Sequence, residues 1–254
     1  MTPLQIGALV ASSIGAGAMN AMAGGGTILT YPTLLFLGES AIVANATSTI
    51  ALWPGAAASM WGYRREVATH RRWLTTLLVP SLVGGAIGSV LLLKTPEKTF
   101  ERLAPFLILF ATALFLVQGA VAKSSAGRTE APTRGRLAAA LLFQLAVAIY
   151  GGYFGAGIGI LMLATLGFLG LGDIHAMNGL KNFFGMCINA VAAAYFIARG
   201  AVQWPAALVM VGGAIAGGYG GARFARRLGK ERSRAAVVVI GLGIAALLFV
   251  RGLR

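Results

Sequence analysis

Acidic side chains are scarce in this sequence. Among its 254 residues there are seven, and all of them lie in predicted loops or at the ends of apolar stretches: Glu39, Glu66, Glu97, Glu101, Glu130, Asp173 and Glu231. A cation site inside a membrane, and most proton relays, need a carboxylate within the apolar region. The shortage therefore argues against cation transport and against carboxylate-based intramembrane proteolysis.

Cysteine and histidine are also rare. Cys187 is the single cysteine, which excludes an intrachain disulfide and makes a cysteine-based metal cluster implausible. The two histidines, His70 and His175, fall at the ends of apolar stretches and offer little for a haem or zinc site. We therefore expect no cofactor, no metal and no enzymatic activity.

Apolar residues dominate the chain, which is 57% hydrophobic and 11% charged. A soluble domain cannot bury so much apolar surface. The net charge of +14 would suggest nucleic-acid binding in a soluble protein, but the Lys and Arg residues lie almost wholly between apolar stretches. Membrane topology places them there. The sequence predicts an all-α polytopic membrane protein that binds no nucleic acid.

A long uncharged stretch runs from Leu4 to Gly38 and carries Gly24-Gly25-Gly26 in its middle. Three glycines disfavour a lipid-facing helix, because unwound backbone persists at membrane depth only where protein or water satisfies its polar groups. We predict a helical hairpin whose two legs have about 17 residues, or about 25 Å, each. Its glycine tip lies inside the protein, because each leg is short against a hydrocarbon core of about 30 Å.

A second uncharged stretch, Leu137 to Gly172, repeats this pattern, with breaks at Gly151-Gly152 and Gly155-Ala156-Gly157. GGTILTYPTLLFLG (25–38) matches GIGILMLATLGFLG (157–170) at eight of fourteen positions without a gap, and VGGAI recurs at 83–87 and 211–215. Two matches in register indicate a duplication.

Each copy continues with three apolar stretches. In the first copy they are 40–63, 73–93 and 103–122, and in the second 175–198, 203–222 and 235–250. The polar segment 123–136 joins the copies. We predict repeats 1–122 and 137–254, each a glycine-broken hairpin followed by three transmembrane helices, within one membrane domain.

The distribution of Lys and Arg predicts the topology. Lys181 lies inside a predicted span, which leaves 20 of the 21 basic residues to compare. If each hairpin returns to its own side, loops 64–72, 123–136 and 223–234 share a side that holds 14 of them, against six. Eight simple spans would divide them 11 to nine. The positive-inside rule favours the first arrangement, with these loops cytoplasmic, both termini outside and the two repeats inverted.

Inverted repeats with broken helices are a recurring transporter plan, with the substrate site near the midplane at the repeat interface. We predict that the hairpin tips and the polar clusters that follow each hairpin converge on one cavity, where helix N-termini and backbone N–H groups attract an anion. The candidate substrate-binding residues are Gly24, Gly25, Gly26, Thr27, Asn45, Thr47, Ser48, Thr49, Gly155, Gly157, Asn178, Lys181 and Asn182. The alternative for their hydroxyl and amide groups is hydrogen bonding between helices.

Lys181 is the one basic residue with uncharged chain on both sides, from 176 to 198. A lysine near the bilayer centre costs about 2.5–3.5 kcal/mol on insertion scales. No span supplies an acidic partner, so we expect a bound anion, with Asn178 and Asn182 as further donors. The alternative is that Lys181 snorkels to the cytoplasmic interface, since it lies only about 9 Å along a helix from His175.

With GGGTILTYPTLLFLG and ANATSTIALWPGAAAS in one half and MNGLKNFFGMCINAVAAAYF in the other, the chain resembles the TauE/SafE family of sulfite and organosulfonate exporters over nearly its whole length. The resemblance implies a secondary transporter of the bacterial plasma (inner) membrane that exports such anions by alternating access. Its partners would be a small sulfur-containing anion and the lipid bilayer, with homo-oligomerisation left open. The alternatives are transport of another small anion and a non-transporting membrane scaffold or assembly protein.

Overall fold

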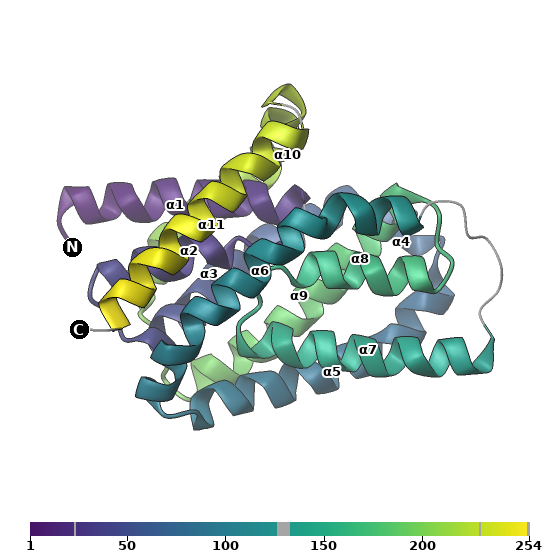
Figure 1. The fold of residues 1–254 in the computed structure, drawn as a ribbon, viewed down its shortest axis with the longest axis horizontal. Coiled ribbons are helices and arrows are strands. Elements are labelled where there is room, and N and C mark those ends of the chain that lie inside the picture. Colours follow the sequence, from purple (N-terminus) through teal and green to yellow (C-terminus); the bar gives the residue numbers. More distant parts are fainter. Residues whose placement is uncertain (23, 126–132, 229, 253–254) are drawn as a thin grey trace.

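In the computed structural model, which describes residues 1–22, 24–125, 133–228 and 230–252, all regular structure is helical (Figure 1). In chain order the helices are α1 (Pro3–Met22), α2 (Thr27–Phe36), α3 (Ala41–Gly62), α4 (Arg64–Ala68), α5 (Arg71–Lys94), α6 (Glu97–Ser125), α7 (Arg134–Tyr153), α8 (Ile158–Phe168), α9 (Ile174–Ala198), α10 (Trp204–Leu228) and α11 (Lys230–Gly252). Within the described residues, α1, α5, α6, α7 and α9 are long and apolar enough to cross a membrane. The all-α polytopic membrane class is confirmed.

Each hairpin pairs a long helix with a short one. The helices α1 and α7 have 20 residues each, whereas α2 has 10 and α8 has 11. The prediction of equal legs is wrong because the break does not lie in the middle of either stretch, so that a longer leg precedes it and a shorter one follows it. The short legs end just before Gly38 and Gly170, whose φ values of 98° and 89° are typical of glycine at a helix C-terminus. A 10-residue helix rises only about 15 Å, so α2 and α8 reach about half-way through a bilayer core.

The breaks between the legs lie at the glycines, as predicted, but not at all of them. Gly24 and Gly25 in one hairpin and Gly155 and Gly157 in the other have positive φ values between 77° and 118°. The predicted break at Gly151-Gly152 is wrong, because both residues continue helix α7.

All three predicted basic loops contain helical residues; in the linker these are 123–125, at the end of α6, and 134–136, at the start of α7. Loop 64–72 includes α4 and the first residues of α5, and the segment 223–234 is helical on both sides of residue 229, which lies outside the described residues. Lys and Arg are good helix formers, so helices extend past the apolar region. Of the predicted linker 123–136, residues 126–132 also lie outside the described residues. The division of the chain at this linker stays a prediction.

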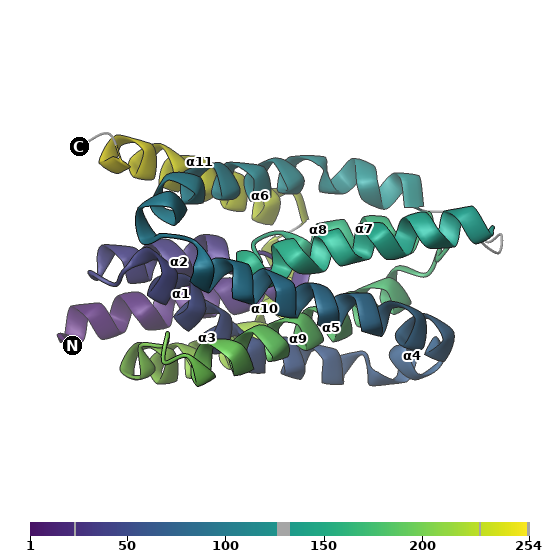
Figure 2. The same ribbon diagram turned by 90° about the horizontal axis from the view of Figure 1, so that it is seen from below.

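The long helices of each half pack mainly on helices of the other half. Helix α1 packs on α10 and α7 packs on α5, while α3 packs on α9 and α6 on α11 (Figure 2). Glycine permits the close approach, since a Cβ atom on Gly17 would lie 2.8 Å from Gly218 N, and one on Gly88 would lie 2.8 Å from Tyr153 N. Because the alignment makes α1 equivalent to α7 and α10 to α5, the halves interlock through corresponding helices.

The equivalent helices α1 and α7 run in opposite directions along the long axis (Figure 1). The start of α1 and the end of α11 lie at one end of the molecule (Figure 1, Figure 2). The start of α7 lies at the other end, as does α4. Inverted repeats require such opposed directions. The inversion relative to the bilayer and the sidedness of the termini stay predictions.

The sidedness can be tested with two exposed positions at opposite ends of the molecule. In a Cys187→Ser background, which removes the single thiol, we expect Lys98→Cys to react with an impermeant maleimide in intact cells and Ala68→Cys to be protected. Both should react after permeabilisation. Labelling of Ala68→Cys from outside would contradict the predicted topology.

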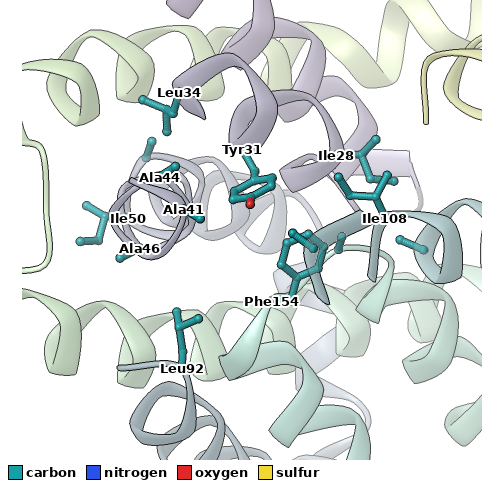
Figure 3. Packing of buried hydrophobic residues seen from close by; sticks show 14 of the residues in the cluster. Ile28, Tyr31, Leu34, Ala41, Ala44, Ala46, Ile50, Leu92, Ile108 and Phe154 are labelled. Atoms are coloured by element: carbon teal, nitrogen blue, oxygen red, sulfur yellow. The ribbon is translucent and has the colours of Figure 1, made fainter. Parts of the chain in front are cut away.

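An aromatic cluster joins the two hairpins. Tyr31 of α2 is fully buried and meets the rings of Phe154 and Phe100 edge-on, with centroid distances of 5.5 and 6.1 Å (Figure 3). Such ring pairs contribute about 0.5–1.5 kcal/mol each beyond the area that they bury. Because Phe154 immediately follows α7, the cluster fixes the second hairpin against the short helix of the first.

Candidate functional site

The glycine tips of the two hairpins touch inside the protein. A Cβ atom on Gly24 would lie 3.0 Å from the backbone N and Cα of Gly159, and one on Gly25 would lie 3.2 Å from Gly157 N. Both positive φ values and this lack of room require glycine here. The predicted convergence of the two tips is therefore present in the fold.

The side chain of Asn20, on the last turn of α1, caps the backbone of the glycine tip in the first hairpin. Its Oδ1 accepts hydrogen bonds from the backbone N–H groups of Gly25, at 2.9 Å, and Gly26, at 2.8 Å. These two donors at the start of α2 are thus already paired within the protein. Asn20 is not among the residues predicted from the sequence, although an amide one helical turn before a glycine break is a signal for such a cap.

The effect of this cap on stability can be measured. We expect Asn20→Leu to lower the free energy of unfolding by about 1–3 kcal/mol, because two backbone donors lose their acceptor. A thermal-unfolding series in detergent tests this, and equal unfolding temperatures for Asn20→Leu and the parent would contradict it.

In the second hairpin, side chains bond backbone carbonyl groups at the tip rather than backbone N–H groups. The Tyr150 hydroxyl donates to the Ala156 carbonyl at 2.7 Å, and Asn45 Nδ2, from α3, donates to the Tyr153 carbonyl at 2.9 Å. Asn45 is predicted from the sequence to contact substrate. The structure instead places its amide nitrogen on the backbone of the other hairpin.

Two other predicted hydroxyl residues also bond between helices. Thr47 Oγ1 accepts from the backbone N of Gln203, just before α10, at 2.9 Å, and the Ser48 hydroxyl bonds that of Thr30 in α2 at 2.5 Å. Both Thr47 and Ser48 are completely buried. Their positions fit the alternative role of linking helices.

A cavity of about 50 Å³ lies where both tips, α3 and α9 meet. A buried site needs about 10–15 Å³ of such volume for one water molecule, so this cavity has room for a small ion. Among the predicted site residues, those that line it are Gly24, Gly25, Thr27, Thr49, Gly155, Lys181 and Asn182. Those that do not line it are Gly26, Asn45, Thr47, Ser48, Gly157 and Asn178.

Two unpaired hydrogen-bond donors belong to the cavity wall. Lys181 is 2% exposed and its Nζ has no hydrogen-bond partner among the described residues. Asn182 is 7% exposed, and its Nδ2 is likewise buried and unpaired. Buried polar groups are nearly always paired, so both donors require an acceptor. The burial of Lys181 does not fit the snorkelling alternative, in which its ammonium would reach the interface.

One face of α9 forms the polar wall of the cavity. Lys181, Gly185 and Asn189 follow one another at intervals of four residues and line it together with Asn182. Gly185 and Asn189 are not among the predicted residues, although this helical spacing from Lys181 indicates them. Thr49, Leu52 and Ala56 of α3 form the facing wall. When the polar clusters that follow the two hairpins are aligned at Asn45 and Asn178, these three positions are equivalent to Asn182, Gly185 and Asn189.

The cavity therefore has a polar side and an apolar side. The polar side carries the charge of Lys181 and the amides of α9, whereas Leu52, Ile158 and Met162 contribute apolar surface. Among the described residues, no group of three or more His, Cys, Asp or Glu side chains is arranged to hold a metal ion. Such a wall suits a ligand with a negatively charged, oxygen-rich end and a small apolar end.

Comparisons with known proteins identify a family and relatives over nearly the whole chain. Residues 9–248 match the family described as sulfite exporter TauE/SafE. The chain is 29% identical over 235 residues to a probable membrane transporter protein of Haemophilus influenzae. This alignment covers 90% of the present chain and 88% of the relative. It is 27% identical over 256 residues to the probable membrane transporter protein YfcA of Escherichia coli K12, covering 98% of this chain and 91% of the relative. No solved structure matches the chain significantly.

Proposed function

Because the chain belongs to the sulfite exporter TauE/SafE family and is an integral membrane transporter, we propose that it exports small sulfur-containing oxyanions, such as sulfite or organosulfonates, from bacterial cells. The observation that carries this proposal is the buried Lys181 beside the central cavity, whose Nζ has no partner in the described part of the chain. The candidate binding residues are the lining residues on α9 and at the two hairpin tips.

The charge of Lys181 favours an anionic ligand. A buried ammonium without a partner is strongly unfavourable, and an anion in the cavity supplies both the opposite charge and the missing acceptor. Oxygen atoms of a sulfite or sulfonate group can accept from Lys181 Nζ and Asn182 Nδ2 together, and hydrogen bonds of this charge-assisted kind are about twice as strong as neutral ones.

The apolar wall favours a sulfonate with a small uncharged tail. Leu52, Ile158 and Met162 offer the tail apolar contacts. A cationic tail such as the ammonium of taurine would find no carboxylate, because the described residues that line the cavity include no Asp or Glu. We therefore expect methanesulfonate to bind more tightly than taurine.

Alternating access is supported by where the cavity lies. Its walls come from both halves of the chain, with the first hairpin and α3 on one side and the second hairpin and α9 on the other. A rocking movement of one half against the other would expose such a cavity first to one side of the membrane and then to the other.

A thermal-shift series with the purified protein tests the substrate class. Sulfite and methanesulfonate should stabilise the protein, by about 2.7 kcal/mol at a concentration of about 100 Kd. Dimethyl sulfone, the neutral control of similar shape, should have no effect. Equal stabilisation by chloride, nitrate and methanesulfonate would instead indicate a transporter of small anions in general.

Flux through reconstituted vesicles separates a transporter from a scaffold. Vesicles loaded with radiolabelled methanesulfonate should release it faster when they contain the protein than when they contain lipid alone. If no anion stabilises the protein and no anion leaves the vesicles, the chain is a non-transporting membrane protein and the proposed substrate class is wrong.

A further inference from the structure

Among the described residues that line the cavity, Lys181 is the only ionisable one, since each of the others is Asn, Thr, Gly or apolar. The helices that pack on α9 are α3, α4, α5, α7 and α8. Of these, α3 and α8 contain no ionisable side chain. The charged residues of the other three lie near the helix ends, outside the cavity wall: Arg64, Arg65, Glu66, Arg71, Arg72, Lys94, Arg134 and Arg136.

The remaining titratable groups near α9 do not line the cavity. The Tyr150 hydroxyl donates to Ala156, and the Tyr153 hydroxyl bonds Thr95 Oγ1 at 3.3 Å. Tyr63 lies beside Gly179, and Asp173 and His175 are exposed at the start of α9, where Asp173 accepts from His175 N. Cys187 and Tyr195, also on α9, do not line the cavity. When the anion leaves, the described part of the chain therefore offers the ammonium of Lys181 no negative charge beside the cavity.

A buried ammonium that faces no negative charge is unfavourable, so in the empty cavity Lys181 gives up its proton and becomes a neutral amine. We propose that Lys181 takes up a proton when an anion binds and releases it when the anion leaves, so that each anion crosses the membrane with one proton. This inference rests on the proposed function, because it takes the anion site to be the cavity beside Lys181. The neutral amine, a proton and the anion combine to give the ammonium–anion pair.

The proton comes from the water on the side to which the cavity is open and is released on the other side with the anion. For a monovalent sulfonate, no net charge crosses the membrane in such a cycle. The membrane potential then does no work on transport, whereas a pH gradient does. Export therefore needs a substrate gradient that exceeds the opposing inward proton gradient.

Linkage gives this inference a measurable signature. If binding takes up one proton, the Kd for the anion rises about tenfold per pH unit above the pH at which empty Lys181 titrates. Lys181→Arg is the matched control, because a guanidinium keeps its proton in proteins. Its Kd should not change over the same pH range.

Isothermal titration of the purified protein with methanesulfonate measures the proton directly. The titration is done in Tris and in bicine, because neither carries a sulfonate group, both buffer in this range and they differ in heat of ionisation. From about pH 7.5 to about pH 9, proton uptake by the parent should rise towards one per bound anion, whereas Lys181→Arg should show none. Binding by the parent with no proton uptake and a constant Kd would overturn the coupling and leave the anion site intact.

Failure of the proposed function would look different, since no anion would then bind to the parent at any pH, and both proposals would fall. Should Lys181→Arg not fold, vesicles that contain the parent protein still test the coupling. An inward proton gradient should accelerate methanesulfonate uptake severalfold, and a potassium diffusion potential set with valinomycin should not. A rate that follows the potential and ignores the pH gradient would overturn the inference.

Discussion

Lys181→Met is expected to weaken the binding of methanesulfonate and sulfite about 10- to 150-fold, while leaving the yield and the unfolding temperature near those of the parent. Methionine has a similar length and fills irregular apolar space. Removing a buried charge that has no partner among the described residues should not destabilise the fold. Losing one hydrogen bond to a charged group costs about 1.5–3 kcal/mol, or about 10- to 150-fold in Kd.

Two control variants test whether the loss of binding comes from the charge of Lys181 itself. Lys98→Met removes an exposed lysine from the start of α6 and should leave the Kd unchanged. Lys181→Arg keeps the positive charge with a different shape and should retain part of the binding. Parent-like affinity in Lys181→Met, measured by titration calorimetry, would contradict the assignment and leave the site to the glycine tips and Thr49.

Much of the fold could be predicted because its main constraint is local. Uncharged stretches long enough to span, interrupted by clustered glycines, indicate the breaks at Gly24 and Gly155, although the nearby pair Gly151-Gly152 continues α7. The unequal legs were missed because the glycines do not divide the stretch from Leu4 to Gly38 equally: α1 has 20 residues, whereas α2 has 10. Helix within the basic segments was missed because clustered charge is typical of loops as well as of helix ends.

The candidate site was predicted less completely, for a geometric reason. A charge within an apolar stretch is visible in sequence, and this identified Lys181. Whether Thr47 or Thr49 faces the cavity depends on how α3 is rotated against its neighbours, and the stretch ANATSTIALW has polar groups on more than one face. Gly185 could not be recognised as a site residue by its chemistry, because it has no polar or charged group and adds to the cavity only the space that a side chain would fill.

That space permits a second test with a large expected effect. A Cβ atom added to Gly185 would meet no atom within 4 Å, and the residue lines the cavity. The first side-chain carbon of Gly185→Leu should therefore fit without displacing backbone, and we expect the rest of the side chain to take up space in the cavity of about 50 Å³. Replacing glycine inside a helix also favours the helix by up to about 1 kcal/mol. We expect anion binding and vesicle flux to be lost from a protein at least as stable as the parent.

Gly212→Leu is the matched control for this substitution. Gly212 also lies within a helix, α10, and a Cβ atom added to it would likewise meet no atom within 4 Å, but it is exposed and does not line the cavity. It should gain the same helix propensity and keep the Kd of the parent for methanesulfonate. Gly185→Ala, which adds a single carbon, should weaken binding less than leucine does. If Gly185→Leu binds and transports methanesulfonate as the parent does, the substrate does not occupy this cavity.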